Sequence, residues 1–286
     1  MKQILTVLTI LLGAVFAQCS PEAPVEHEKP VIVTSIFPLY DITRSITGNR
    51  ADVFFVVDIG ANPHTYEPTP ATAKKISRAD IFIGVRKEFD GWIEKFLAPK
   101  ARRLYLQEGD HHGNPHIWLS IRKGKDIARK ITRFLGVQYP AMKAHCDGNL
   151  MGYLAQLDTT DAEISHILKP VKAKKMIQWH SAWDYFAADY GIIIAGTVES
   201  GHGDQPSVKR FKSLIDKAKR EGIRAVAIGL NSEDRAASSL IREINGFQIR
   251  LDSIGSPDIT DRSSYILLMK YNAETIARKL GKGKAR

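Results

Sequence analysis

The hydrophobic positions after residue 30 alternate between short β-branched runs and longer stretches with helical spacing. Residues 31–36, 53–57 and 79–84 are short apolar runs, which are typical of buried strands. Residues 39–47 and 70–77, which lie between them, have helical spacing. Because strands that alternate with helices form parallel βαβ units, this pattern predicts an α/β layer architecture.

The middle of the chain departs from this alternation. Residues 122–135 and 141–168 are long amphipathic stretches, and only Gly148 and Gly152 interrupt the second one before Pro170 closes it. A helix of that length has no place inside a compact βαβ unit. We therefore predict that it connects two lobes.

The alternation returns after residue 170 and predicts a second lobe. The predicted strands are 175–179, 192–198, 225–230 and 247–251, and the predicted helices are 181–189, 207–221, a segment that ends at 245, and 263–280 with Gly281 as its cap. The predicted fold class is α/β, with two (βα) lobes of mostly parallel sheet joined by a long connecting helix. We place the N-terminal lobe at 31–137, the connecting helix region at 138–169 and the C-terminal lobe at 170–286.

The start of the chain has the order of a secretory signal. A single charge at Lys2 precedes an apolar run over residues 4–16, and small residues follow it. This run is too short to span a membrane as a stable helix. We therefore predict a signal peptide over residues 1–18 and an exported protein.

Two ways of processing the signal peptide are open. Residues 15–17 form an acceptable signal-peptidase site with cleavage after Ala17, whereas residues 16–19 form an imperfect lipobox that ends at Cys19. We favour lipidation of Cys19. Residues 19–30 are rich in proline and glutamate, and we predict that they form a flexible tether. The expected location is the periplasm or the outer side of the cytoplasmic membrane, with a lipid anchor.

Composition narrows the possible function classes. Of the 286 residues, 44% are hydrophobic and 25% are charged, which excludes a mainly disordered chain. The formal net charge of +10 would suit nucleic acid, but no basic block is interleaved with aromatic residues, so we expect a solvated basic surface and no nucleic-acid partner. The two cysteines, Cys19 and Cys146, are too few for a thiolate zinc module. Any metal must therefore be held by histidine and carboxylate.

Four polar side chains occupy strand ends or turns in the two predicted lobes. His64 follows a Gly-Ala-Asn-Pro turn, His116 follows Gly-Asn-Pro, and His180 and Asp252 come directly after strands. The carboxyl ends of parallel strands are where ligands bind, so these four side chains point to a metal site in the cleft between the lobes. A single histidine more commonly caps a helix or contacts a carbonyl. Three histidines and one aspartate together fill a tetrahedral zinc shell.

Several segments of this chain resemble the zinc/manganese solute-binding proteins of bacterial ABC importers. The matching segments are VTSIFP at 33–38, PHTYEPTP at 63–70, NPHIWL at 114–119, HSAWDYF at 180–186, LDSIG at 251–255 and residues 265–272. The resemblance covers nearly the whole chain after residue 30. It implies two lobes bridged by one long helix, with a metal buried between them.

The resemblance also implies the role of each ligand. His64 and His116 match the first two ligands and Asp252 the fourth. The third falls on His180, where zinc-binding members carry histidine and manganese-binding members carry glutamate, so Zn²⁺ is the expected cargo. Glu67 matches a residue that accepts a hydrogen bond from a ligand N–H group. The alternative interpretation is that Glu67 is a carboxylate at the start of a helix, where the helix dipole favours it.

The chain also departs from the family pattern. The long histidine-rich loop of many zinc-binding members is reduced to His111 and His112, and Gly229 stands where the family commonly has glutamate. His202 lies in a glycine-rich loop over residues 199–204. Weak metal collection and a plain solvated turn both remain open for His111 and His112, and an accessory ligand and a mobile surface loop remain open for His202.

The leading hypothesis is a non-enzymatic receptor that captures Zn²⁺ and delivers it to the permease of an ABC importer, acting as a monomer. One alternative is a manganese-binding protein of the same family. A zinc hydrolase is a weaker alternative, because four protein ligands leave no open metal position and because no Gly-x-Ser-x-Gly or His-Glu-x-x-His motif occurs. A surface adhesin that ignores metal is the last alternative.

Overall fold

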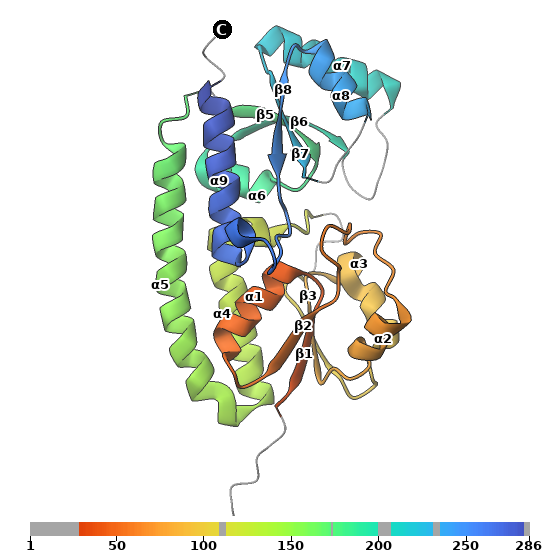
Figure 1. Cartoon of the computed structure of the whole chain (residues 1–286), viewed down its shortest axis with the longest axis vertical. Coiled ribbons are helices and arrows are strands. Elements are labelled where there is room, and N and C mark those ends of the chain that lie inside the picture. Colours follow the sequence, from red (N-terminus) through yellow and green to blue (C-terminus); the bar gives the residue numbers. More distant parts are fainter. Residues whose placement is uncertain (1–28, 109–112, 173, 200–206, 231–234, 283–286) are drawn as a thin grey trace, which may run out of the picture.

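The structure is a computed structural model, and it describes residues 29–108, 113–172, 174–199, 207–230 and 235–282. Two four-stranded sheets form the centres of two lobes (Figure 1). Their strand orders are β2-β1-β3-β4 and β6-β5-β7-β8, and every strand pair within the described ranges is parallel. The α/β prediction with two mostly parallel sheets is therefore confirmed.

The first sheet has a buried central strand pair. Its strands are β1 (Val31–Thr34), β2 (Asp52–Phe55), β3 (Ile81–Gly84) and β4 (Arg102–Tyr105), and the helices between them are α1 (Phe37–Thr47), α2 (Pro70–Ile76) and α3 (Lys87–Asp90). Pro38 lies in the first turn of α1, where its missing N–H group costs no hydrogen bond, so the helix begins earlier than the predicted residue 39. Gly48, with a φ of 55°, ends α1.

The second sheet repeats this arrangement. Its strands are β5 (Lys175–His180), β6 (Ile193–Glu199), β7 (Ala225–Gly229) and β8 (Phe247–Leu251), and its helices are α6 (Asp184–Tyr190), α7 (Val208–Glu221) and α8 (Arg235–Glu243). Helix α6 begins three residues later than predicted, because Ala182 donates its N–H to the carbonyl of His180 in a tight turn. β5 is one of the two inner strands of this sheet, and its residues 176–179 are all buried.

Three long helices line one side of both lobes (Figure 1). They are α4 (Ile121–Gln138), α5 (Lys143–Leu168) and α9 (Tyr265–Lys282), and α5 packs against α1, α4 and α9. α5 carries the chain from the first lobe to the second, which confirms the predicted connecting helix. Gly281 lies inside α9 and does not cap it, so that prediction is wrong: its φ is not positive, and the helix continues to Lys282.

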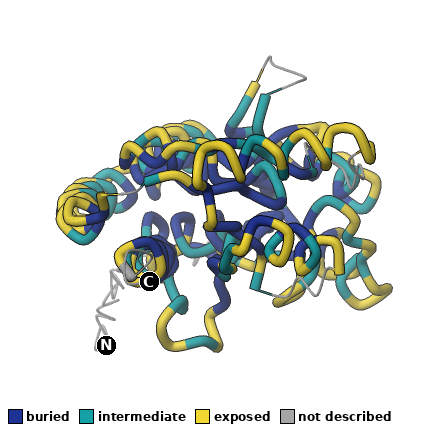
Figure 2. The backbone as a smooth tube through the Cα atoms, turned by 90° about the horizontal axis from the view of Figure 1, so that it is seen from above, coloured by how far each residue is buried: buried dark blue, intermediate teal, exposed yellow. Residues whose placement is uncertain are grey.

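Burial follows the layer arrangement. Seen from above, the backbone is buried near the middle of the molecule, and the outer turns of the helices are exposed (Figure 2). Within the described ranges, each helix is either too short or too polar to cross a lipid bilayer.

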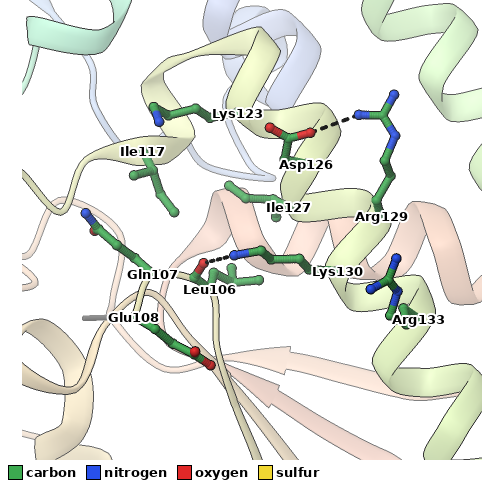
Figure 3. A pocket seen from close by; sticks show the side chains of 10 residues that line it. All are labelled: Leu106, Gln107, Glu108, Ile117, Lys123, Asp126, Ile127, Arg129, Lys130 and Arg133. Carbon is green, nitrogen blue, oxygen red and sulfur yellow. Dashed lines mark hydrogen bonds and ion pairs between the residues drawn. The ribbon is translucent and has the colours of Figure 1, made fainter. Parts of the chain in front are cut away.

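Helix α4 also borders a cavity of about 460 Å³ next to the end of β4 (Figure 3). Leu106 and Ile127 are apolar side chains at this cavity, and Lys130 donates from Nζ to the carbonyl of Leu106 at 2.8 Å. Arg129 pairs with Asp126 at 3.0 Å on the same helix. Side chains of both charge signs therefore share this cavity.

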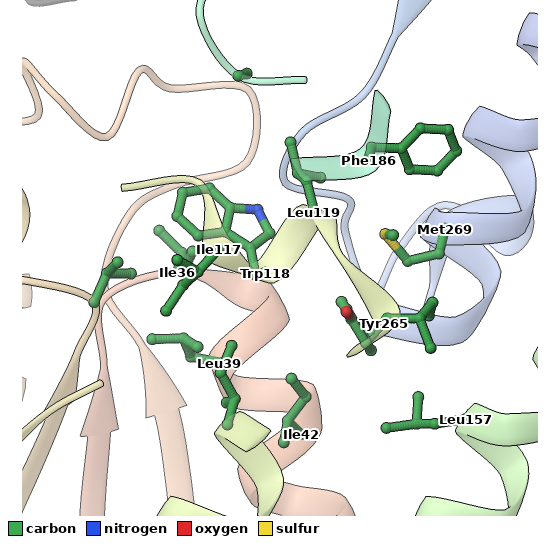
Figure 4. Close-up of a cluster of buried hydrophobic side chains, with 14 of the residues drawn as sticks. Ile36, Leu39, Ile42, Ile117, Trp118, Leu119, Leu157, Phe186, Tyr265 and Met269 are labelled. Atoms are coloured by element: carbon green, nitrogen blue, oxygen red, sulfur yellow. The ribbon is translucent and has the colours of Figure 1, made fainter. Parts of the chain in front are cut away.

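One hydrophobic cluster runs from the first lobe through the helical layer into the second (Figure 4). Trp118 is fully buried within it, and its indole Nε1 donates to the carbonyl of Ser253 at 2.6 Å. Leu157 of α5, Phe186 of α6 and Met269 of α9 belong to the same cluster. Because interiors of this kind are closely packed, the cluster holds the two lobes together on the helix side.

Candidate metal centre

Three histidine side chains meet between the two lobes. The Nε2 atoms of His64 and His116 are 3.4 Å apart, and those of His116 and His180 are 3.3 Å apart. The ligand atoms of all three lie within 4.8 Å of one another. Zn–N bonds of about 2.0–2.1 Å at tetrahedral angles separate two nitrogens by about 3.3–3.4 Å. The spacing around His116 therefore fits a tetrahedral ion.

Two of these histidines are held by the same short motif. Each follows an Asn-Pro pair, and the Oδ1 atom of the asparagine accepts the backbone N–H of the histidine two residues later. The distances are 3.0 Å from Asn62 to His64 and 2.9 Å from Asn114 to His116. Such turns fix the local backbone, and proline restricts it further. The Asn-Pro turns that marked both histidines in the sequence therefore also hold their backbones in the structure.

Asn114 holds both the ring of His116 and the opposite lobe. Its Oδ1 atom lies 2.7 Å from Nδ1 of His116, so Nδ1 carries the proton and Nε2 presents its lone pair. Its Nδ2 atom donates to the carbonyl of Ser181 at 2.8 Å and to Oδ2 of Asp184 at 2.7 Å. Asp184 in turn accepts from the buried Gln178 at 2.7 Å. Asn114 thus positions a candidate ligand, and the sequence reasoning did not single it out.

The environment of His116 favours the neutral imidazole. Only 3% of this residue is exposed, and its burial lowers the pKa well below the ordinary value. The neighbouring His180 and His64 lower the pKa further, and so does the buried Arg86. A neutral imidazole is the form that binds a metal ion.

The histidines open onto a cavity of about 450 Å³ between the lobes. Residues of both lobes line it, including Trp118 from the first lobe and Trp179 and Leu251 from the second. Gly229 also lines the cavity, so the position where the family commonly has glutamate supplies no carboxylate here. The predicted position of the site, in a cleft between two lobes, agrees with this geometry.

Asp252 lines the same cavity but is not one of the donors within 4.8 Å of one another. Its Oδ1 atom accepts the backbone N–H groups of Ile254 and Gly255, each at 2.9 Å. Its Oδ2 atom is 3.4 Å from Nη1 of Arg262. The structure thus brings together three of the four predicted ligands, and the role of Asp252 stays a prediction.

The other residues considered in the sequence divide between this cavity, other parts of the fold and segments outside the described ranges. Glu67 is exposed before α2 and does not line the cavity. Glu199 does line it, and its Oε1 atom accepts from the indole Nε1 of Trp179 at 2.9 Å. Cys146 is a buried free thiol in α5. The predictions for Cys19, His111, His112 and His202 concern residues that the structure does not describe.

Comparison with known proteins identifies the family. The model of the family described as "Zinc-uptake complex component A periplasmic" matches residues 32–279. The chain is 26% identical to the "Zinc-binding lipoprotein AdcA" of Streptococcus pneumoniae, over 96% of this chain and 60% of that protein. It is 27% identical to the "Manganese ABC transporter substrate-binding lipoprotein PsaA" of Streptococcus anginosus, over 99% of this chain and all of that protein. The chain thus spans about 60% of the length of AdcA and the full length of PsaA.

Solved structures share the fold. A structure described as "Crystal structure of ZnuA" is 26% identical, with a TM-score of 0.77 over 88% of this chain and 100% of that chain. A manganese-bound periplasmic metal binding protein from Candidatus Liberibacter asiaticus has a TM-score of 0.76 over the same shares, at 19% identity. The family consists of non-enzymatic metal-binding transport proteins. Because its model matches most of the chain, this protein belongs to the family of periplasmic zinc-uptake components A.

Proposed function

We propose that this chain is a receptor outside the cytoplasm that captures Zn²⁺ and delivers it to the permease of an ABC importer. Membership of the family supports binding of a divalent metal ion. The observation that carries the choice of zinc is the spacing of the three Nε2 atoms, which lie 3.3 and 3.4 Å apart around His116. This spacing is that of a tetrahedral zinc shell.

The proposed ligands are His64, His116, His180 and Asp252. Three imidazoles and one carboxylate favour Zn²⁺ over Mn²⁺, which prefers oxygen-rich shells with more ligands. The names of the relatives divide between the two metals, since AdcA is a zinc-binding lipoprotein and PsaA a manganese-transporter lipoprotein. The nitrogen-rich donor set therefore supports zinc for this chain, and Mn²⁺ is the second candidate.

The rest of the proposal concerns the location and partners of the protein. We propose export by the signal peptide over 1–18 and anchoring through a lipidated Cys19, with residues 19–30 as the tether. The names of the relatives support this, because both AdcA and PsaA are called lipoproteins. The partners are the metal ion and the membrane permease, and the receptor acts as a monomer. Glu67 is proposed to support a ligand N–H group once the metal is bound.

Metal analysis of the purified protein tests the proposal. The protein is prepared without chelators and without a histidine tag, its metals are counted by mass spectrometry, and Zn²⁺ and Mn²⁺ then compete for it. We expect about one zinc per chain and loss of that zinc in His116→Ala. His166→Ala, which changes an exposed histidine on α5, is the matched control and keeps the zinc. Full zinc content in His116→Ala would overturn the site, and preferential loading with Mn²⁺ would overturn the cargo.

A further inference from the structure

We infer that Arg262 is an internal counter-ion that competes with the metal for Asp252 and thereby sets the metal affinity. This inference rests on the proposed function, because it concerns the fourth ligand of the same site. It starts from the cavity, where an arginine and an aspartate of the same loop region face each other beside three imidazoles.

The contacts of Asp252 leave one oxygen atom for a metal ion. Its Oδ1 atom already accepts two backbone N–H groups, from Ile254 and Gly255. Its Oδ2 atom makes the ion pair with Nη1 of Arg262. Both side chains are largely buried, with 13% of Arg262 and 17% of Asp252 exposed. A metal ion that takes Oδ2 as a ligand therefore competes with the guanidinium group for that atom.

The ion pair is held in place but poorly aligned. The guanidinium group of Arg262 lies over the ring of Tyr271, 4.7 Å from its centroid, and Nε donates to Asp261 at 3.1 Å. Nη1, the atom that faces Asp252, is buried and makes no hydrogen bond within the described part of the chain. At 3.4 Å the attraction is electrostatic and lacks the geometry of a charged hydrogen bond. Such a pair neutralises the carboxylate yet can be exchanged for a metal ion.

Arginine suits this role because it keeps its charge at every physiological pH. A buried carboxylate without a counter-ion would be costly, and Arg262 prevents this state while it faces Asp252. The same positive charge opposes a divalent cation that enters the cavity. Arg262 therefore weakens metal binding and favours release, which a receptor that hands over its cargo requires.

The test compares Arg262→Met, which keeps the length of the side chain without its charge, with Arg262→Lys, which keeps the charge. Zinc affinity is measured by competition with a coloured chelator. We expect Arg262→Met to bind zinc about tenfold more tightly, a usual coupling between neighbouring charged groups, and Arg262→Lys to stay within about threefold of the parent. Arg129→Met, which breaks the exposed pair with Asp126, is the matched control and leaves the affinity unchanged.

Two further measurements isolate the exchange. In the background of Asp252→Asn, the tighter binding caused by Arg262→Met should shrink to less than about threefold, because the neutral amide no longer attracts the guanidinium group. Without metal, Arg262→Met should lower the unfolding temperature more in the parent than in Asp252→Asn, and this readout stands even if the proposed cargo is wrong. Zinc binding by folded Arg262→Met at or below the parent affinity would overturn the inference. The same holds if the full gain persisted in Asp252→Asn.

Discussion

Asn114 both positions a metal ligand and joins the two lobes, and Asn114→Ala removes both roles at once. The substitution removes the acceptor of the His116 Nδ1 proton, at 2.7 Å, and the donor to Ser181 and Asp184, at 2.8 and 2.7 Å. Groups that orient a ligand typically contribute about 10- to 100-fold to metal affinity. We therefore expect zinc to bind Asn114→Ala about 10- to 100-fold more weakly than the parent.

Stability should fall in the same variant. Each intramolecular hydrogen bond contributes about 0.5–1.5 kcal/mol net, so losing the two contacts to the second lobe should cost about 1–3 kcal/mol of unfolding free energy. Asn114→Asp keeps an acceptor for His116 but places a like charge next to Asp184, which is 2.7 Å away in the parent. We expect this variant to lose stability while it keeps zinc affinity within about tenfold of the parent.

The assay is a zinc titration against a coloured chelator, together with denaturant unfolding of the metal-free protein. Asn149→Ala is the matched control, because Asn149 also joins two elements, donating to the carbonyl of Ile46 at 2.9 Å, but lies outside the cavity. This control should lose stability and keep its zinc affinity. Zinc binding by Asn114→Ala within threefold of the parent would refute the positioning argument.

Four other predictions follow from the same contacts. The folded state lowers the pKa of His116, so the unfolded chain takes up a proton first as the pH falls below about 6.5, and the metal-free protein should lose up to about 1.4 kcal/mol of stability per pH unit there. His116→Asn should flatten this slope in denaturant titrations, and an unchanged slope would contradict the assignment. His180→Glu should lower the Zn²⁺/Mn²⁺ affinity ratio measured by competition, since it replaces a nitrogen donor by oxygen, and an unchanged ratio would mean that lobe geometry decides. Trp118→Phe should cost about 1–3 kcal/mol in chemical denaturation, because it removes the bond to Ser253 and leaves a gap, and a stability equal to the parent would argue against that contact. Zinc at about 100 times its dissociation constant should stabilise the fold by about 2.7 kcal/mol in thermal unfolding, and the gain should vanish with chelator; stabilisation that survives the chelator would exclude linkage to the metal.

Local patterns in the sequence were sufficient for most elements of the two lobes. The strand at residues 247–251 was predicted to the residue, because its apolar residues alternate with polar ones, which is typical of a strand with one buried face. β4 was not predicted. Its residues Arg102 and Arg103 are polar and exposed, so no apolar run marks this edge strand, which pairs with β3. Only the completed sheet shows that this polar segment pairs.

The candidate site also has features that the sequence predicts and features that only the tertiary structure shows. The sequence by itself determined which side chains stand at strand ends, because strand limits and Asn-Pro-His turns are local, and so it predicted His64, His116 and His180. Only the tertiary structure decided the partners of those side chains. Asn114 meets Asp184 across 70 residues of chain, and the Oδ2 atom of Asp252 faces Arg262 instead of the histidines. Such contacts depend on how the two lobes pack against each other through the helical layer. Residues from distant parts of the chain set that packing, so no short segment of sequence predicts it.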